Sequence, residues 1–234
     1  KRYPYCIDKT QRAMAKTGGS DSLDFWGSCA PVWSQKHLPC PYGHRVPLPA
    51  SDFTWPDGNT TADWYAALLC TLPFDWVLLW LVLLLRCRGV REVVLGGLLS
   101  IDYLVIVVLQ NSFQEPRPKG SCLTSCGMPS GHAVLCVSLM CWISAELAQR
   151  LPSPRSLVLI LLVVALHLPV TWAKVHLRDH TEKQVLCGAL VGACLGFGYF
   201  RLLRKCHLGL AAWLCQKGLV DNYEGKEDYI PLAG

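Results

Sequence analysis

Apolar residues occur in five blocks, near 64–85, 93–109, 133–148, 156–173 and 185–203. Each block approaches the length of about 20 residues that a helix needs to cross a membrane. The run from Val77 to Leu85 has no polar face at the 3.6-residue period of a soluble surface helix. The pattern predicts an all-α, polytopic membrane helical bundle with about five transmembrane helices. The alternative, a buried bundle in a soluble protein, would leave little polar surface.

The flanking segments differ from these blocks. Residues 1–50 are rich in Pro, Gly, Ser and charge and have no sustained period, so we expect a lumenal, poorly ordered tail of unknown role. The membrane domain is expected at 51–205, and 206–234 is expected to hold a short interfacial helix and a polar tail. Because the chain does not begin with Met, we also expect a segment upstream of it.

Charge indicates the orientation of the bundle. Only 17% of residues are charged, against about 25% in a typical soluble domain. Basic residues are enriched at the helix ends opposite the motif loops described below, and cytoplasmic loops carry such an excess. They are Arg86, Arg88, Arg91, Arg150, Arg155, Arg201, Arg204 and Lys205. The bias predicts that the motif loops face the lumenal or outer side.

Two short motifs offer groups that bind phosphate. In Glu115-Pro-Arg-Pro118 the prolines stiffen the chain around Arg117, whose guanidinium can bind a phosphate through two hydrogen bonds. In Pro129-Ser-Gly-His132 a helix is expected to begin at Ser130 or Gly131, and a helix N-terminus binds anions. His132 would lie in its first turn. Taken alone, each motif is equally typical of an interfacial Arg or of a turn that caps a membrane helix.

A third motif runs from Lys174 to His180 between two blocks. His176 and His180 are four residues apart, a spacing that also fits a metal pair on one helix face. Since successive spans alternate in direction, all three motif loops are predicted on one side of the membrane. Cys122 and Cys126 share one of these loops, where a short disulfide is possible and a zinc site is less favoured.

These motifs resemble those of the phosphatidic acid phosphatase type 2 superfamily, whose pattern is K-x6-R-P, P-S-G-H and S-R-x5-H-x3-D. Longer sequence segments around and beyond these motifs resemble the dolichyl diphosphatase branch of that superfamily. They are Gln114-Glu-Pro-Arg-Pro118, Gly127-Met-Pro-Ser-Gly-His132, His180-Thr-Glu-Lys-Gln-Val-Leu186, Phe53-Thr-Trp-Pro-Asp-Gly58 and Leu210-Ala-Ala-Trp213. The resemblance covers roughly residues 51–232, and it implies a haloperoxidase-like helical core.

The resemblance also implies roles for single residues. His180 matches the nucleophile that forms a phosphohistidine, and His132 matches the acid that protonates the leaving oxygen. Arg117 matches a phosphate ligand, and Ser130 and Gly131 match the anion site at the helix end.

Four positions depart from the superfamily pattern. Gln110 occupies the position of the family's Lys, Ala173 that of its Ser, and Lys174 that of its Arg. We expect Gln110 and Lys174 to bind phosphate at these positions, although they lack the family's side chains. Gln184 stands for the Asp that orients the nucleophile, and Gln at this place resembles the dolichyl branch. We therefore expect Gln184 to orient His180.

The expected activity is hydrolysis of dolichyl diphosphate to dolichyl phosphate and inorganic phosphate in the endoplasmic reticulum membrane, which recycles the carrier lipid for protein N-glycosylation. No metal, cofactor or nucleic acid is expected; the partners are the polyprenyl diphosphate substrate and the bilayer. Three alternatives stay open: a phosphatase for another lipid phosphate or polyprenyl diphosphate, a non-catalytic lipid-phosphate binding protein, and, more weakly, a transporter. Asp75, Asp102 and His167 are interpreted as helix-packing residues.

Overall fold

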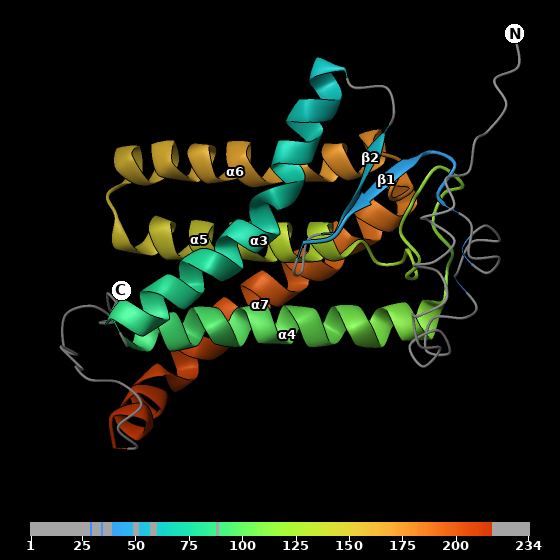
Figure 1. Ribbon diagram of the computed structural model, residues 1–234. Helices are drawn as coiled ribbons and strands as arrows, with labels where there is room; N and C mark the ends of the chain where they lie inside the picture. The colour runs from blue at the N-terminus through green and yellow to red at the C-terminus, as the bar shows by residue number, and fades with distance from the viewer. Residues whose placement is uncertain are drawn as a thin grey trace, which may run out of the picture.

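The computed structural model describes residues 29, 34, 39–48, 52–56, 60–87 and 89–216, with side chains placed as far as residue 206 (Figure 1). Within these residues, five long helices follow two short strands. They are α3 (Thr61–Cys87), α4 (Val90–Phe113), α5 (Gly131–Arg150), α6 (Ser153–His176) and α7 (Glu182–Gln216). All five are long and apolar enough to cross a membrane, which confirms the predicted bundle.

The outer faces of the helices are apolar as well as the inner ones. Large side chains such as Leu68, Leu104, Leu161 and Leu190 are exposed on α3, α4, α6 and α7. In water such an apolar surface would be unfavourable, but the hydrocarbon of a membrane solvates it without cost. The backbone N–H and C=O groups are satisfied within each helix, as hydrocarbon requires. The arrangement is that of a bundle surrounded by lipid.

Helix α5 lies at the centre and packs along α6 and α7 (Figure 1). Gly188, Gly192 and Gly196 repeat every four residues on α7 and press against the α5 backbone. A Cβ atom at Gly188 would lie 2.6 Å from the carbonyl oxygen of Ser130. Small residues at this spacing let two membrane helices approach closely. The contact fixes the start of α7 beside the start of α5.

A two-stranded hairpin supplements the helices. β1 (Gly43–Val46) pairs antiparallel with β2 (Phe53–Pro56), and Arg45 lies opposite Thr54. The predicted boundary at residue 50 is therefore not a structural one, because β1 belongs to the predicted tail and β2 to the predicted domain. Residues 1–28 of that tail lie outside the described residues.

Two disulfides tie the N-terminal region to the loop between α4 and α5. Cys29 bonds Cys126, and Cys40 bonds Cys122. The short Cys122–Cys126 bridge considered from sequence is wrong, since each cysteine has a partner more than eighty positions earlier in the chain. Spacing within the loop gave no sign of these partners.

The structure also differs from the expectation of a separate C-terminal helix. Helix α7 continues through residue 205 to Gln216 without a break. A single Gly209 does not end a helix whose neighbours are good helix formers. The predicted polar tail at 217–234 lies outside the described residues.

Candidate functional site

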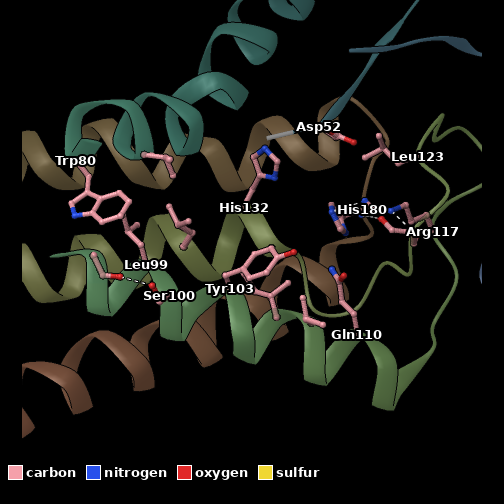
Figure 2. Close-up of a pocket in the computed structure, with 17 residues that line it drawn as sticks. Asp52, Trp80, Leu99, Ser100, Tyr103, Gln110, Arg117, Leu123, His132 and His180 are labelled. Atoms are coloured by element: carbon pink, nitrogen blue, oxygen red, sulfur yellow. Dashed lines mark hydrogen bonds between the residues drawn. The ribbon is translucent and has the colours of Figure 1, made fainter. Parts of the chain in front are cut away.

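The three motifs meet at one end of the bundle (Figure 1). The loop 114–130 follows α4, the first turn of α5 follows that loop, and the turn 177–181 joins α6 to α7. Alternation of the helices brings them together, as expected from sequence. Figure 2 shows His132, His180, Arg117 and Gln110 around one cavity.

His180 is held by both ring nitrogens. Its Nδ1 lies 2.8 Å from the carbonyl oxygen of Gly127, and its Nε2 lies 2.7 Å from Nη1 of Arg117. A carbonyl oxygen only accepts hydrogen bonds, so Nδ1 carries the hydrogen and Nε2 carries the lone pair. The side chain is buried. Nε2 is therefore an unprotonated nitrogen that faces a phosphate-binding cation.

Burial lowers the pKa of His180 well below its ordinary range, and the positive charges of Arg117 and Lys174 lower it further. The Gly127 carbonyl opposes this shift, with a smaller effect. At neutral pH the imidazole is uncharged. This is the form that a nucleophilic histidine requires.

Arg117 is fixed by the loop around it. Its Nε and Nη2 donate to the backbone oxygen and the hydroxyl of Ser125, both at 2.9 Å, and its Nη1 donates to the backbone oxygen of Asp179 at 3.0 Å. Burial lowers its pKa to about 10, and the carboxylates of Asp179 and Asp52 act in the opposite direction. Arg117 therefore remains charged at neutral pH and presents its cation beside His180.

His132 lies in the first turn of α5, as predicted. Its Nε2 lies 3.2 Å from the carbonyl oxygen of Cys70 in α3. Since the carbonyl requires a donor, Nε2 carries the hydrogen. Nδ1 is then the ring atom that can take up and release a proton.

The start of α5 meets the anion-site expectation only in part. Gly131 lines the cavity, but the backbone N–H of Ser130 donates to the carbonyl oxygen of Gln184. The Ser130 hydroxyl is buried and makes no capping bond. Gln110 lines the cavity too, and its Nε2 donates to the carbonyl oxygen of Pro129 at 3.1 Å. Gln110 thus supports the Pro129 loop.

Lys174 has a different place from the one expected. It is fully buried, and its Nζ lies 2.7 Å from the Asp179 carboxylate and 3.1 Å from the backbone oxygen of Asp52. It does not line the cavity that holds the histidines. Because Asp179 matches its charge, Lys174 holds the turn before His180 instead of presenting a free cation. A buried lysine without such a partner would be costly.

Asp179 was given no site role from sequence, and it organises this turn. Both of its carboxylate oxygens accept the backbone N–H of Thr54 at 3.1 Å, and one accepts the Ser121 hydroxyl at 3.3 Å. Arg178 beside it has a φ of 56°, in the left-handed region. The only sequence signal was an acidic residue five positions after a lysine, which is weak. Asp179 joins the hairpin, the loop and the His180 turn.

Gln184 makes no hydrogen bond to the His180 ring, so the expected orienting bond is absent. Its Oε1 accepts the backbone N–H of Thr181, and its Nε2 donates to the Glu115 carboxylate and to the Pro116 carbonyl oxygen. The Gly127 carbonyl orients His180 instead. A Cβ at position 127 would lie 2.7 Å from Nε2 of Gln184, so a side chain there would require the Gln184 amide to shift. Gln184 therefore acts on the loop and not on the ring.

His176 and His180 do not form a pair. Nε2 of His176 lies 2.9 Å from the Asp63 carboxylate, and its ring stacks on Trp172. In the described part of the chain no three His, Cys, Asp or Glu side chains are grouped so that they could hold a metal ion. His167 accepts the indole N–H of Trp76, a contact between α6 and α3 that fits its interpretation as a helix-packing residue.

The cavity measures about 520 Å³ and runs from the two histidines along α4 (Figure 2). Its apolar lining comes from Val77, Trp80, Leu99, Ile106, Val107 and Leu135. Tyr103 lies between the polar and the apolar part. A molecule with an anionic head and a long hydrocarbon tail matches both ends.

Comparison with known proteins agrees with this geometry. The family model of the PAP2 (phosphatidic acid phosphatase type 2) superfamily matches residues 91–208. The chain is 31% identical over 130 residues to Dolichyldiphosphatase 1 of Dictyostelium discoideum. The match covers 53% of this chain and 57% of that protein, so the chain spans little more than half the length of this relative. No solved structure matches the chain.

Proposed function

The chain belongs to the PAP2 superfamily, and from this membership we propose that it hydrolyses a polyprenyl diphosphate, dolichyl diphosphate in particular. The observation that carries the proposal is the unprotonated Nε2 of His180, held 2.7 Å from Arg117 at the polar end of an apolar cavity. Similarity to a dolichyldiphosphatase supports the choice of substrate. The products are dolichyl phosphate and inorganic phosphate.

In the first step the lone pair of His180 Nε2 attacks the terminal phosphorus. The hydrogen bond from Arg117 to Nε2 is exchanged for one from Arg117 to a phosphoryl oxygen, so the cation follows the negative charge. The bond from phosphorus to the bridging oxygen breaks, and that oxygen takes the Nδ1 proton of His132, which enters this step as the imidazolium. A phosphohistidine and dolichyl phosphate result. Fixed cations stabilise the charge on the equatorial oxygens of the transition state.

In the second step water cleaves the phosphohistidine. His132 Nδ1, now unprotonated, accepts a proton from the attacking water, and the phosphorus–nitrogen bond breaks. Inorganic phosphate leaves, and both histidines return to their starting state. Throughout, the Cys70 carbonyl keeps the hydrogen on Nε2 of His132. Such acid–base assistance contributes roughly 10²–10⁴-fold to a rate.

The position of the cavity supports a lipid substrate. Its apolar part lies against α3, α4 and α5 at the depth of the spans, while its polar part holds the histidines. A polyprenyl tail can stay in the hydrocarbon while the diphosphate reaches His180. Transfer of each CH₂ group out of water favours this placement by about 0.8 kcal/mol.

We place the site on the lumenal side of the endoplasmic reticulum membrane, where it would recycle the carrier lipid for protein N-glycosylation. The two disulfides support this side, because disulfides persist in oxidising compartments and both lie at the motif end of the bundle. The Arg-rich turns at the opposite end support it through the positive-inside rule.

The test is phosphate release by the purified protein from dolichyl diphosphate, dolichyl phosphate and phosphatidate, each with and without EDTA. We expect release from the diphosphate to be fastest and to survive EDTA. Faster release from phosphatidate would assign another lipid. Tight binding of all three lipids without any release would favour a non-catalytic binding protein.

A further inference from the structure

The β1–β2 hairpin is attached to the catalytic loops at Thr54. The Thr54 backbone N–H donates to the carboxylate of Asp179, the residue before His180. The Thr54 hydroxyl accepts the backbone N–H of Cys122 at 2.8 Å. Thr54 is buried. The face of the hairpin that carries the Thr54 side chain is therefore turned toward the loop that holds Arg117.

Arg45 lies on that same face. It is the cross-strand partner of Thr54, and opposed residues of an antiparallel pair project to the same side. Its Nε donates to the Asp52 carboxylate at 2.9 Å, and its Nη2 donates to the same oxygen. The Arg45 side chain is 51% exposed, against 31% for Asp52. The guanidinium can therefore move without leaving a buried charge behind.

Asp52 is a carboxylate where an anion is expected to bind. It lines the same cavity as Arg117 and His180 (Figure 2). Both charges of the pair act on the site: after burial, which lowers the pKa of Arg117 most, Asp52 raises that pKa and Arg45 lowers it. An unpaired carboxylate here would repel phosphate, so the state of the Arg45–Asp52 pair bears directly on binding.

The positive charge inside the site falls short of what a phosphate requires. A phosphate monoester carries roughly −1.5 to −2 charge at neutral pH. Lys174 is matched by Asp179, and Gln110 is uncharged, although both stand where cations were expected. Among the described residues that line the cavity, Arg117 is the one lysine or arginine, and its single charge does not balance the ligand. A further cation at the mouth of the cavity would supply the missing charge.

We propose that Arg45 is a phosphate-binding residue, held by Asp52 when the site is empty and transferred to the terminal phosphoryl group when substrate binds. The inference rests on the proposed function, since it takes the ligand to be that phosphoryl group. Arg45 exchanges a carboxylate for a phosphate, both of which suit its guanidinium. Asp52 sets the cost of that exchange.

The two partners therefore have opposite effects on anion binding. We would measure the affinity of the purified full chain for inorganic phosphate and for orthovanadate by calorimetry. Arg45→Ala is expected to weaken binding about tenfold, the effect of a lost hydrogen bond to a charged group. Asp52→Asn is expected to strengthen it severalfold, because Arg45 is released and a negative charge is removed. Arg45→Lys should fall between Arg45→Ala and the unchanged chain.

The matched control is the exposed pair Arg150–Glu146 at the other end of the bundle. Arg150→Ala and Glu146→Gln should leave phosphate affinity unchanged. If Arg45→Ala and Asp52→Asn shift affinity in the same direction, or if neither shifts it, Arg45 is a structural partner of Asp52 only and the proposal is overturned.

Arg117→Ala separates this proposal from the proposed function. Suppose that Arg117→Ala loses phosphate binding while Arg45→Ala and Asp52→Asn change the affinity equally. That result would reject the role of Arg45 and leave the proposed function standing. Unchanged phosphate binding in Arg117→Ala would reject the site itself, and with it both proposals. Midpoints of thermal unfolding for each variant show whether an affinity change reflects an unfolded fraction.

Discussion

His180 and Gly127 are joined by a hydrogen bond of 2.8 Å between the ring Nδ1 and the backbone carbonyl oxygen. A neutral carbonyl fixes the tautomer of the histidine without placing a negative charge beside it. The orientation of the ring then depends on the position of the loop that carries Gly127. The backbone N–H of Gly127 is in turn bound 2.7 Å from the carbonyl oxygen of Glu115.

Gly127→Ala should therefore lower kcat without removing the nucleophile. The new Cβ would meet the Gln184 amide, which then loses its hydrogen bonds to Glu115 and Pro116 of the same loop, and the Gly127 carbonyl is expected to move relative to His180. A displacement of about 1 Å in a catalytic group can reduce a rate on the order of 10²-fold. The matched control is Gly198→Ala, where a Cβ would have no neighbour within 4 Å. Equal kcat in the two variants would contradict the role of the Gly127 carbonyl.

Gln184→Glu should also lower kcat, because it places a second carboxylate against Glu115 and removes the donor to Pro116. Exchanging the two side chains, as Gln184→Glu with Glu115→Gln, restores a donor and an acceptor across the same gap. We expect the double variant to recover a substantial part of the activity that Gln184→Glu loses. A double variant with the summed loss of the two single ones would show that the contact is unimportant.

Reduction of the Cys29–Cys126 disulfide is expected to lower kcat. Cys126 lies between Ser125, which holds Arg117, and Gly127, which holds His180. Releasing it loosens both catalytic groups together. The measurement is kcat for Cys29→Ser with Cys126→Ser, beside Cys87→Ser, whose thiol is free and exposed. An undiminished kcat in the first variant would mean that the loop keeps its position without the bridge.

The pKa of His180 sets the expected pH dependence. Because burial and the nearby cations lower this pKa, His180 stays neutral at pH 7 and becomes protonated only when the pH falls well below the ordinary value of about 6.5. Protonation of His180 should therefore slow phosphoenzyme formation only below that pH. Rapid-quench measurements from about pH 5 to about pH 8 test this, after correction for the ionisation of the substrate. A fall in this rate that reports protonation of His180 at or above about pH 6.5 would contradict the buried environment beside two cations.

The bundle was predictable because its signal is local. Five apolar blocks specify five spans, and alternation of spans brings Arg117, His132 and His180 to one end whatever the details of packing. The repeat of Gly188, Gly192 and Gly196 is also a local signal in the sequence. It explains why the starts of α5 and α7 meet.

The partners of individual side chains were not predictable. Lys174 carried a charge that sequence matched to phosphate, but folding places the Asp179 carboxylate 2.7 Å away. The group that holds His180 is a backbone carbonyl, which no residue type reveals. Cys122 and Cys126 are paired with cysteines from a segment without any periodic pattern. In each case the partner is supplied by tertiary structure.

The most direct test of the account is to trap the phosphoenzyme with dolichyl diphosphate labelled in the terminal phosphate. Acid-labile label should appear on His180 and vanish in His180→Ala. His132→Ala should still be labelled, but slowly, since the nucleophile remains and only the proton transfer is lost. His176→Ala, which removes a histidine bound to Asp63 instead, should be labelled like the unchanged chain. Label on any other residue, or full activity in His180→Ala, would contradict the assignment of His180 as the nucleophile.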